Sequence, residues 1–143
     1  MDWKQEAADT LREYEARHRA LGNIPAEIRR LEMEYTAIRS TMADGMPRSG
    51  QPGRREDAML NNIALREELG LRLEETRQWV AVVEDGLASL EPEERLILEQ
   101  FYVHREHGHV ERLMDRLNVE SKAVYKKKDK ALRRFTLALY GVT

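Results

Sequence analysis

The sequence has no cysteine, few aromatic residues and no long apolar run. Of its 143 residues only 6% are aromatic while 35% are charged, and the mean hydropathy is −0.69. The absence of cysteine excludes a disulfide framework and a thiolate zinc site. No stretch approaches the roughly 20 apolar residues that a membrane-spanning helix needs, and the polar N-terminus lacks the apolar run of a signal peptide. We therefore expect a cytoplasmic protein without a membrane partner.

What the sequence does contain is apolar residues at helical spacing. From residue 24 to residue 42 they recur at alternating steps of four and three, which is a heptad seam. A second seam has the same steps and consists of Met59, Asn62, Arg66, Leu69, Leu73, Thr76, Val80, Val83, Leu87 and Leu90. Narrow apolar stripes in a highly charged chain are typical of long helices and not of one large globular core. The patterns predict an all-α fold.

Two groups of helix-breaking residues interrupt this part of the chain. Gly22, Asn23 and Pro25 predict that one helix ends near residue 22 and another begins at Pro25. Residues 43–54 contain three glycines and two prolines and predict a loop. The simplest role for this loop is to join two antiparallel helices, and its arginines also fit contact with phosphate. We expect residues 1–89 to form a helical coiled-coil body, a hairpin that self-associates.

Positive charge is concentrated in one stretch near the C-terminus. Residues 122–134 hold seven Lys or Arg residues and one Asp, a net charge of +6. Because the whole chain carries −2, the remaining residues carry −8. A cationic segment attached to an acidic body suits a polyanionic partner.

The pattern around this stretch predicts a helix-turn-helix domain over residues 90–143. Pro92 suits the first turn of a leading helix over residues 93–103. Asn118 suits the positive φ of a tight turn between a helix at 110–117 and a second helix that starts near Ser121. The expected core consists of Leu113, Leu117, Val119, Val124, Ala131, Leu132 and Phe135.

The outward face of the second helix carries the predicted DNA contacts. A recognition helix inserts its N-terminal part into the major groove. The predicted base contacts are therefore Ser121, Lys122, Tyr125 and Lys126. The cations farther along circle the helix and are assigned to backbone phosphates, which supply affinity without sequence information. They are Lys127, Lys128, Lys130, Arg133 and Arg134.

Residues 90–139 resemble region 4 of the sigma-70 family. The likeness lies in a leading helix that begins Leu90-Glu-Pro-Glu-Glu and in a basic helix that contains the pair Ala131-Leu132. The whole chain resembles phage and prophage regulators of the ArpU/RinA type, in which a coiled-coil part with a Gly-Met-Pro loop, here residues 45–47, precedes such a module. The resemblance implies a sequence-specific DNA-binding transcriptional regulator of phage late genes. It also implies a face on residues 94–105 that touches RNA polymerase.

Other functions fit the same features. A phage DNA-packaging recognition subunit of the small terminase kind also joins a DNA-binding helix-turn-helix to a coiled coil. An interaction adaptor would instead use the basic helix to bind an acidic protein, without binding DNA. His104, His107 and His109 have a spacing that suits zinc or nickel, but without cysteine they fit a polar connector better. We expect no enzyme, no cofactor and no metal, because no nucleophile or acid pair stands out.

Overall fold

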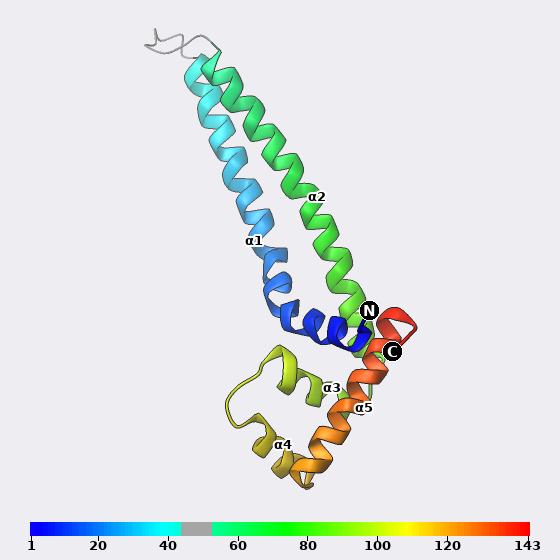
Figure 1. The fold of residues 1–143 in the computed structure, drawn as a ribbon. Helices are drawn as coiled ribbons and strands as arrows, with labels where there is room; N and C mark the ends of the chain where they lie inside the picture. The colour runs from blue at the N-terminus through cyan, green and yellow to red at the C-terminus, as the bar shows by residue number, and fades with distance from the viewer. Residues whose placement is uncertain (44–52) are drawn as a thin grey trace. The chain divides into compact units, whose positions relative to one another are not determined.

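The computed structural model describes residues 1–43 and 53–143, and this part of the chain is helical without any strand (Figure 1). The predicted all-α fold is confirmed. The elements in chain order are α1 (Trp3–Ala43), α2 (Arg54–Ala88), α3 (Pro92–Leu98), the π-helix η1 (Glu99–Val103), α4 (His109–Leu117) and α5 (Ser121–Tyr140). The loop predicted over residues 43–54 lies almost wholly outside the described residues. Of the helices described, none combines the length and the apolar character that crossing a bilayer requires.

The predicted helix break at Gly22 to Pro25 is wrong, because α1 continues through it as one helix with Pro25 inside. An internal proline removes one helix hydrogen bond and costs about 3 kcal/mol. The apolar stripe explains why the helix continues. Its residues before the break end at Leu21 and resume at Ile24, a step of three, so both halves bury the same helix face.

Packing divides the chain into two compact units, one of residues 19–77 and one of residues 1–18 together with 78–143. This division does not coincide with the boundary predicted after residue 89. The beginning of α1 and the end of α2 belong with the C-terminal helices because Leu11 and Leu87 share a buried cluster with Phe135. The helix-turn-helix is therefore part of a larger packed unit.

The unit of residues 19–77 is a helical hairpin in which α1 and α2 run side by side in opposite directions (Figure 1). The predicted seams account for its packing. Every α2 seam residue from Met59 to Thr76 is buried or half-buried, and so is every α1 seam residue from Ile24 to Ile38. The hairpin prediction is thus confirmed for this unit.

A buried polar side chain interrupts the apolar seam of the hairpin. Asn62 is 5% exposed, and its Nδ2 donates to the backbone oxygen of Leu31 at 2.8 Å. Its Oδ1 accepts a hydrogen bond from Nε of Arg66 at 2.8 Å, and Arg66 in turn lies over the ring of Tyr35, 5.1 Å from its centroid. A buried amide that finds its partners in one alignment penalises every other alignment. Asn62 therefore fixes the register of the hairpin.

The other unit contains two buried clusters. The larger joins α1, α2, α3 and α5 through Ala7, Ala8, Leu11, Val83, Leu87, Leu90, Leu98, Ala131, Leu132 and Phe135. The smaller joins α3, η1, α4 and α5 through Ile97, Phe101, Leu113 and Val124, with Leu117 and Val119 packed at its edge. The core predicted for the helix-turn-helix is confirmed at all seven positions, five of them buried and two half-buried.

The leading helix predicted over residues 93–103 changes its winding part-way along. It begins at Pro92, as predicted, and is α-helical as far as Leu98. It then widens into η1, where the backbone N–H of His104 donates to the oxygen of Glu99 at 2.7 Å. Within this wider turn Phe101 is buried in the smaller cluster, while Tyr102 packs against both clusters.

A glycine allows α2 and α5 to pack closely. A Cβ added at Gly86 would lie 3.0 Å from Cε1 of Phe135 and 3.2 Å from Cδ2 of Leu139. These distances are shorter than in most side-chain contacts, so Phe135 and Leu139 would have to move by a few tenths of an ångström. Gly86 therefore holds a helix-interior position, at a cost of roughly 0.5–1 kcal/mol in helix propensity, because the ring of Phe135 occupies the space of a side chain.

The buried amide predicts a measurable loss of stability. Asn62→Ala should lower the free energy of unfolding by about 1–3 kcal/mol, because Arg66 loses its acceptor and no group replaces the amide in the seam. The adjacent Asn61 is exposed and serves as the matched control, for which Asn61→Ala should change the free energy by less than about 0.5 kcal/mol. Urea unfolding followed by circular dichroism measures both. Equal losses would contradict the role given to Asn62.

Candidate nucleic-acid interface

The turn between α4 and α5 has the conformation that the sequence predicts. Asn118 lies in the left-handed region with φ 54° and ψ 51°, and it is the one non-glycine residue with positive φ among those described. The N–H of Val119 donates to the oxygen of Met114 at 3.1 Å, which satisfies a carbonyl at the end of α4. Glu120 is then extended and α5 begins at Ser121. The turn thus fixes where α5 begins relative to α4.

The inner face of α5 fixes the helix in the unit. Val124 is fully buried in the smaller cluster, and Ala131 and Phe135 are fully buried in the larger one. These contacts lie along the length of α5 and include both α4 and α3. As a result, the opposite face of α5 is presented in a fixed orientation, which a recognition helix requires.

The four predicted base contacts, Ser121, Lys122, Tyr125 and Lys126, are all exposed on the leading end of α5. Tyr125 is 48% exposed, and its ring lies edge-on to Phe101 with 5.7 Å between the centroids. This contact restricts the ring of Tyr125 without covering it. No described residue forms an ion pair with Lys122 or Lys126, so both ammonium groups are available to a ligand.

The five predicted phosphate contacts separate into two groups. Lys130 and Arg133 are exposed, and within the described chain neither has an ion pair. In contrast, Nζ of Lys127 lies 3.0 Å from Oε1 of Glu93, and Arg134 Nη1 lies 2.6 Å from Oε1 of Glu94. The pairs of Lys127 and Arg134 join α5 to the acidic first turn of α3, so these two cations help to hold α5 in place. The fifth cation, Lys128, pairs with Asp129 on α5 itself.

The side chain of Lys128 is largely covered, with 19% of its area exposed. Its Nζ lies 2.8 Å from Oδ1 of Asp129 and 5.7 Å from the centroid of the Phe101 ring. Burial on its own lowers the pKa of Lys128, but the hydrogen bond to Asp129 and the neighbouring Tyr102 outweigh it and raise the pKa. Lys128 therefore keeps its charge while packing on the aromatic residues beside the leading end of α5.

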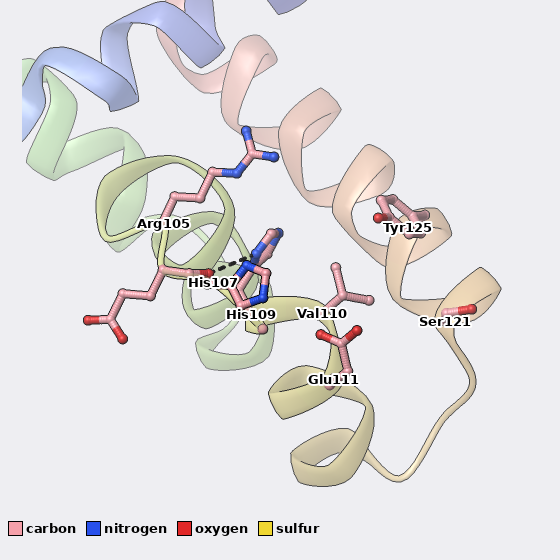
Figure 2. A pocket seen from close by; sticks show the side chains of 9 residues that line it. Arg105, His107, His109, Val110, Glu111, Ser121 and Tyr125 are labelled. Atoms are coloured by element: carbon pink, nitrogen blue, oxygen red, sulfur yellow. Dashed lines mark hydrogen bonds between the residues drawn. The ribbon is translucent and has the colours of Figure 1, made fainter.

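An open pocket of about 680 Å³ lies beside the leading end of α5 (Figure 2). One wall is the start of α5, with Ser121 and Tyr125. The other wall is the connector before α4 and the first turn of α4. The residues on that wall are Arg105, Glu106, His107, Gly108, His109, Val110 and Glu111. Two of the predicted base contacts thus share a hollow with two histidines.

The ring of His109 is held in one orientation within this pocket. It stands edge-on to Phe101 at an interplanar angle of 86°, with 4.7 Å between the centroids. Its Nδ1 lies 3.1 Å from the backbone oxygen of Glu106, the contact drawn as a dashed line in Figure 2. A carbonyl oxygen only accepts, so Nδ1 carries the hydrogen and Nε2 is left for a ligand.

The histidines were predicted to form a polar connector, and the pocket was not predicted. The signal was present as the His-rich stretch at 104–109, but the position of this connector beside α5 depends on tertiary packing. His104 does not line the pocket, and its Nδ1 lies 3.4 Å from Oε2 of Glu15. Over the described ranges, no three His, Cys, Asp or Glu side chains are grouped so that they could hold a metal ion.

The acidic start of α3 predicts a second stability difference. Oε1 of Glu94 accepts hydrogen bonds from Arg134 at 2.6 Å and from the backbone N–H of Glu91 at 3.1 Å, and the side chain is 13% exposed. Glu94→Ala should therefore lower the free energy of unfolding by about 1–3 kcal/mol, since it removes a helix cap and leaves Arg134 unpaired.

Glu93 provides the matched control for this substitution. It is adjacent and also pairs with α5, but its side chain is 47% exposed. Glu93→Ala should cost less than about 1 kcal/mol, as exposed ion pairs do. Thermal unfolding of both variants measures the difference. A larger loss for Glu93→Ala than for Glu94→Ala would contradict the anchoring role of Glu94.

Comparison with known proteins assigns no family to this chain. No protein-family model, no curated protein and no solved structure matches it. The likeness of residues 90–139 to region 4 of the sigma-70 family therefore stays a prediction from the sequence. The chemistry of the site rests on the exposed leading end of α5 and on the pocket beside it.

Proposed function

We propose that this chain is a sequence-specific DNA-binding transcriptional regulator that reads double-stranded DNA with the leading end of α5. The observation that carries the proposal is the exposure of Ser121, Lys122, Tyr125 and Lys126 on a helix whose other face is buried. An α-helix fits into the major groove, and here one face of the helix is buried in the unit while the exposed face is polar. Acidic side chains in place of Lys122 and Lys126 would not give this support.

The side chains at the leading end suit the edges of base pairs. Residues 121, 122, 125 and 126 are spaced so that they share one side of the first turns of α5. Lysine donates to O6 and N7 of guanine, and serine bonds to either bases or phosphates. The Tyr125 hydroxyl is a further donor. We assign base reading to Lys122 and Lys126, supported by Ser121 and Tyr125.

The phosphate contacts are fewer than the cationic stretch alone suggests. Lys130 and Arg133 are exposed and unpaired in the described chain, whereas Lys127 and Arg134 are paired with α3 and Lys128 is largely covered. Each phosphate neutralised adds about −0.9 to the slope of log affinity against log salt. We therefore assign non-specific affinity mainly to Lys130 and Arg133, with smaller shares from the other three.

The resemblance to phage and prophage regulators of the ArpU/RinA type suggests the cellular location and the partners of the chain. In that setting the chain is cytoplasmic, has no catalytic activity and needs no cofactor. Residues 94–105, which include η1, are the proposed contact with RNA polymerase. The hairpin of residues 19–77 is the proposed site of self-association. Two copies would then place two α5 helices on half-sites about one helical turn apart.

The experiment that tests this function is the selection of genomic fragments by the purified protein at moderate salt. The proposal expects a shared sequence among the retained fragments. A large ring of copies, seen by light scattering, would favour a DNA-packaging recognition subunit. An absence of duplex binding even at low salt would favour an adaptor that binds an acidic protein.

Two double variants separate base reading from phosphate binding. Lys122→Ala with Lys126→Ala should reduce the preference for the selected sequence over random duplex by at least about 30-fold, because the two base contacts together contribute roughly 2–6 kcal/mol of discrimination. Lys130→Ala with Arg133→Ala is the charge-matched control on the same helix. It should weaken selected and random duplexes alike and make the salt slope shallower by about 2.

Fluorescence anisotropy titrations at several salt concentrations measure both quantities. The two pairs remove the same number of charges, so a purely electrostatic role would give them the same effect. Equal loss of sequence preference in both variants would contradict the division between base and phosphate contacts.

A further inference from the structure

The pocket beside α5 has a feature that base reading by α5 does not use. Its α5 wall consists of Ser121 and Tyr125, while its other wall carries the imidazoles of His107 and His109 (Figure 2). We propose that this pocket receives a backbone phosphate of the bound duplex, and that protonation of His107 and His109 strengthens this contact. The inference rests on the proposed function, because it needs a duplex held on the leading end of α5.

The position of the pocket supports a phosphate as its ligand. A helix that lies in the major groove has the two sugar-phosphate strands on either side of it. A hollow that shares Ser121 and Tyr125 with the groove-facing end of α5 therefore lies where a strand passes. Its polar lining and open form suit an ionic group of an extended polymer better than a buried apolar ligand.

The histidines offer suitable donors to such a group. Nδ1 of His109 is already bonded to the oxygen of Glu106 at 3.1 Å, so protonation adds an N–H at Nε2. His107 is exposed, and the guanidinium of Arg105 is the permanent cation on the same wall. A phosphodiester keeps its negative charge throughout the range in which imidazoles titrate, so it favours the protonated rings.

The charge of the pocket changes sign with the state of the histidines. With neutral imidazoles the lining holds one cation, Arg105, and two anions, Glu106 and Glu111, which gives a net charge of −1. Protonation of both rings changes this to +1. An acidic lining repels phosphate and a basic lining attracts it.

Charged groups next to the pocket add to its net charge but do not cause the change with pH. Arg112 on α4 lies 3.7 Å from Glu106 and donates to the backbone oxygen of His107 at 3.0 Å. On the α5 side Lys128 lies 6.0 Å from the centroid of the Tyr125 ring, and η1 contributes the neutral ring of Phe101. Arg112 and Lys128 add positive charge beside the pocket, whereas histidine is the side-chain type whose ordinary charge change falls between pH 5 and pH 8.

Binding should consequently take up protons. If a phosphate favours the charged imidazoles, then protonation favours the bound phosphate by the same factor. Affinity for duplex DNA should rise as the pH falls from 8 to 6. One fully coupled histidine gives at most about a tenfold change per pH unit, and two give the square of that.

The test measures duplex affinity by fluorescence anisotropy with the whole chain, from pH 5.5 to pH 8.0 at constant ionic strength. The affinity of the unmodified chain for duplex DNA should be at least about tenfold higher at pH 6 than at pH 8. His107→Gln should lose at least half of the logarithmic gain in affinity between pH 8 and pH 6. Arg105→Gln should weaken binding at every pH and leave the gain in place.

His104→Gln is the matched control, since His104 belongs to the same connector, is exposed, and lies near Glu15 outside the pocket. It should follow the profile of the unmodified chain. A profile for His107→Gln that equals that of the unmodified chain, or a loss that appears only in His104→Gln, overturns the inference. Duplex binding without pH dependence would refute the phosphate pocket alone, whereas no duplex binding at any pH would refute the proposed function as well.

Discussion

The apolar face of α5 is buried along most of its length, at Val124 in the smaller cluster and at Ala131, Leu132 and Phe135 in the larger one. The arrangement of the C-terminal unit depends on this burial. It fixes the rotation of α5 about its own axis, and thereby decides which side chains face outward. Close packing of helices around a ring of the size of Phe135 leaves few alternative positions for α5. The ring packs against Gly86 of α2, where a larger residue would crowd it. The same clusters include the first turns of α1, so the unit that carries the helix-turn-helix is built from both ends of the chain.

The cationic stretch of α5 has two physical roles that its composition does not distinguish. Lys127 and Arg134 are paired with the acidic start of α3, and Lys128 packs on aromatic rings. These residues help to hold the helix in place, while the cations at its leading end and at Lys130 and Arg133 are open to a ligand. A polyanion that approached α5 would compete with Glu93 and Glu94 for the paired cations. The salt dependence of binding should therefore reflect the exposed cations first.

Much of the fold was predictable because helical seams are local patterns. The seam of the hairpin and the core of the helix-turn-helix follow directly from residue spacing. The positive φ of Asn118 follows from its residue type and from its place after the last leucine of the helix. The helix break predicted at Gly22 to Pro25 was wrong, because the apolar stripe continues past these helix-breaking residues and α1 continues with it. The pairing of α5 with α3 and the pocket at His107 depend on contacts between distant residues, which no local pattern encodes. The exposure of Tyr125 was predicted, yet its support by Phe101 was not.

We propose that α5, fixed by its buried face, presents its leading end to the major groove of DNA. The most direct measurement is a map of backbone amide chemical shifts by NMR as a selected duplex is added to the isotopically labelled protein. The account predicts that the largest shifts fall on residues 119–126 and on residues 105–111, while the buried residues of α5 change little. Shifts concentrated in the hairpin of residues 19–77, with the leading end of α5 unaffected by a duplex that binds, would contradict it.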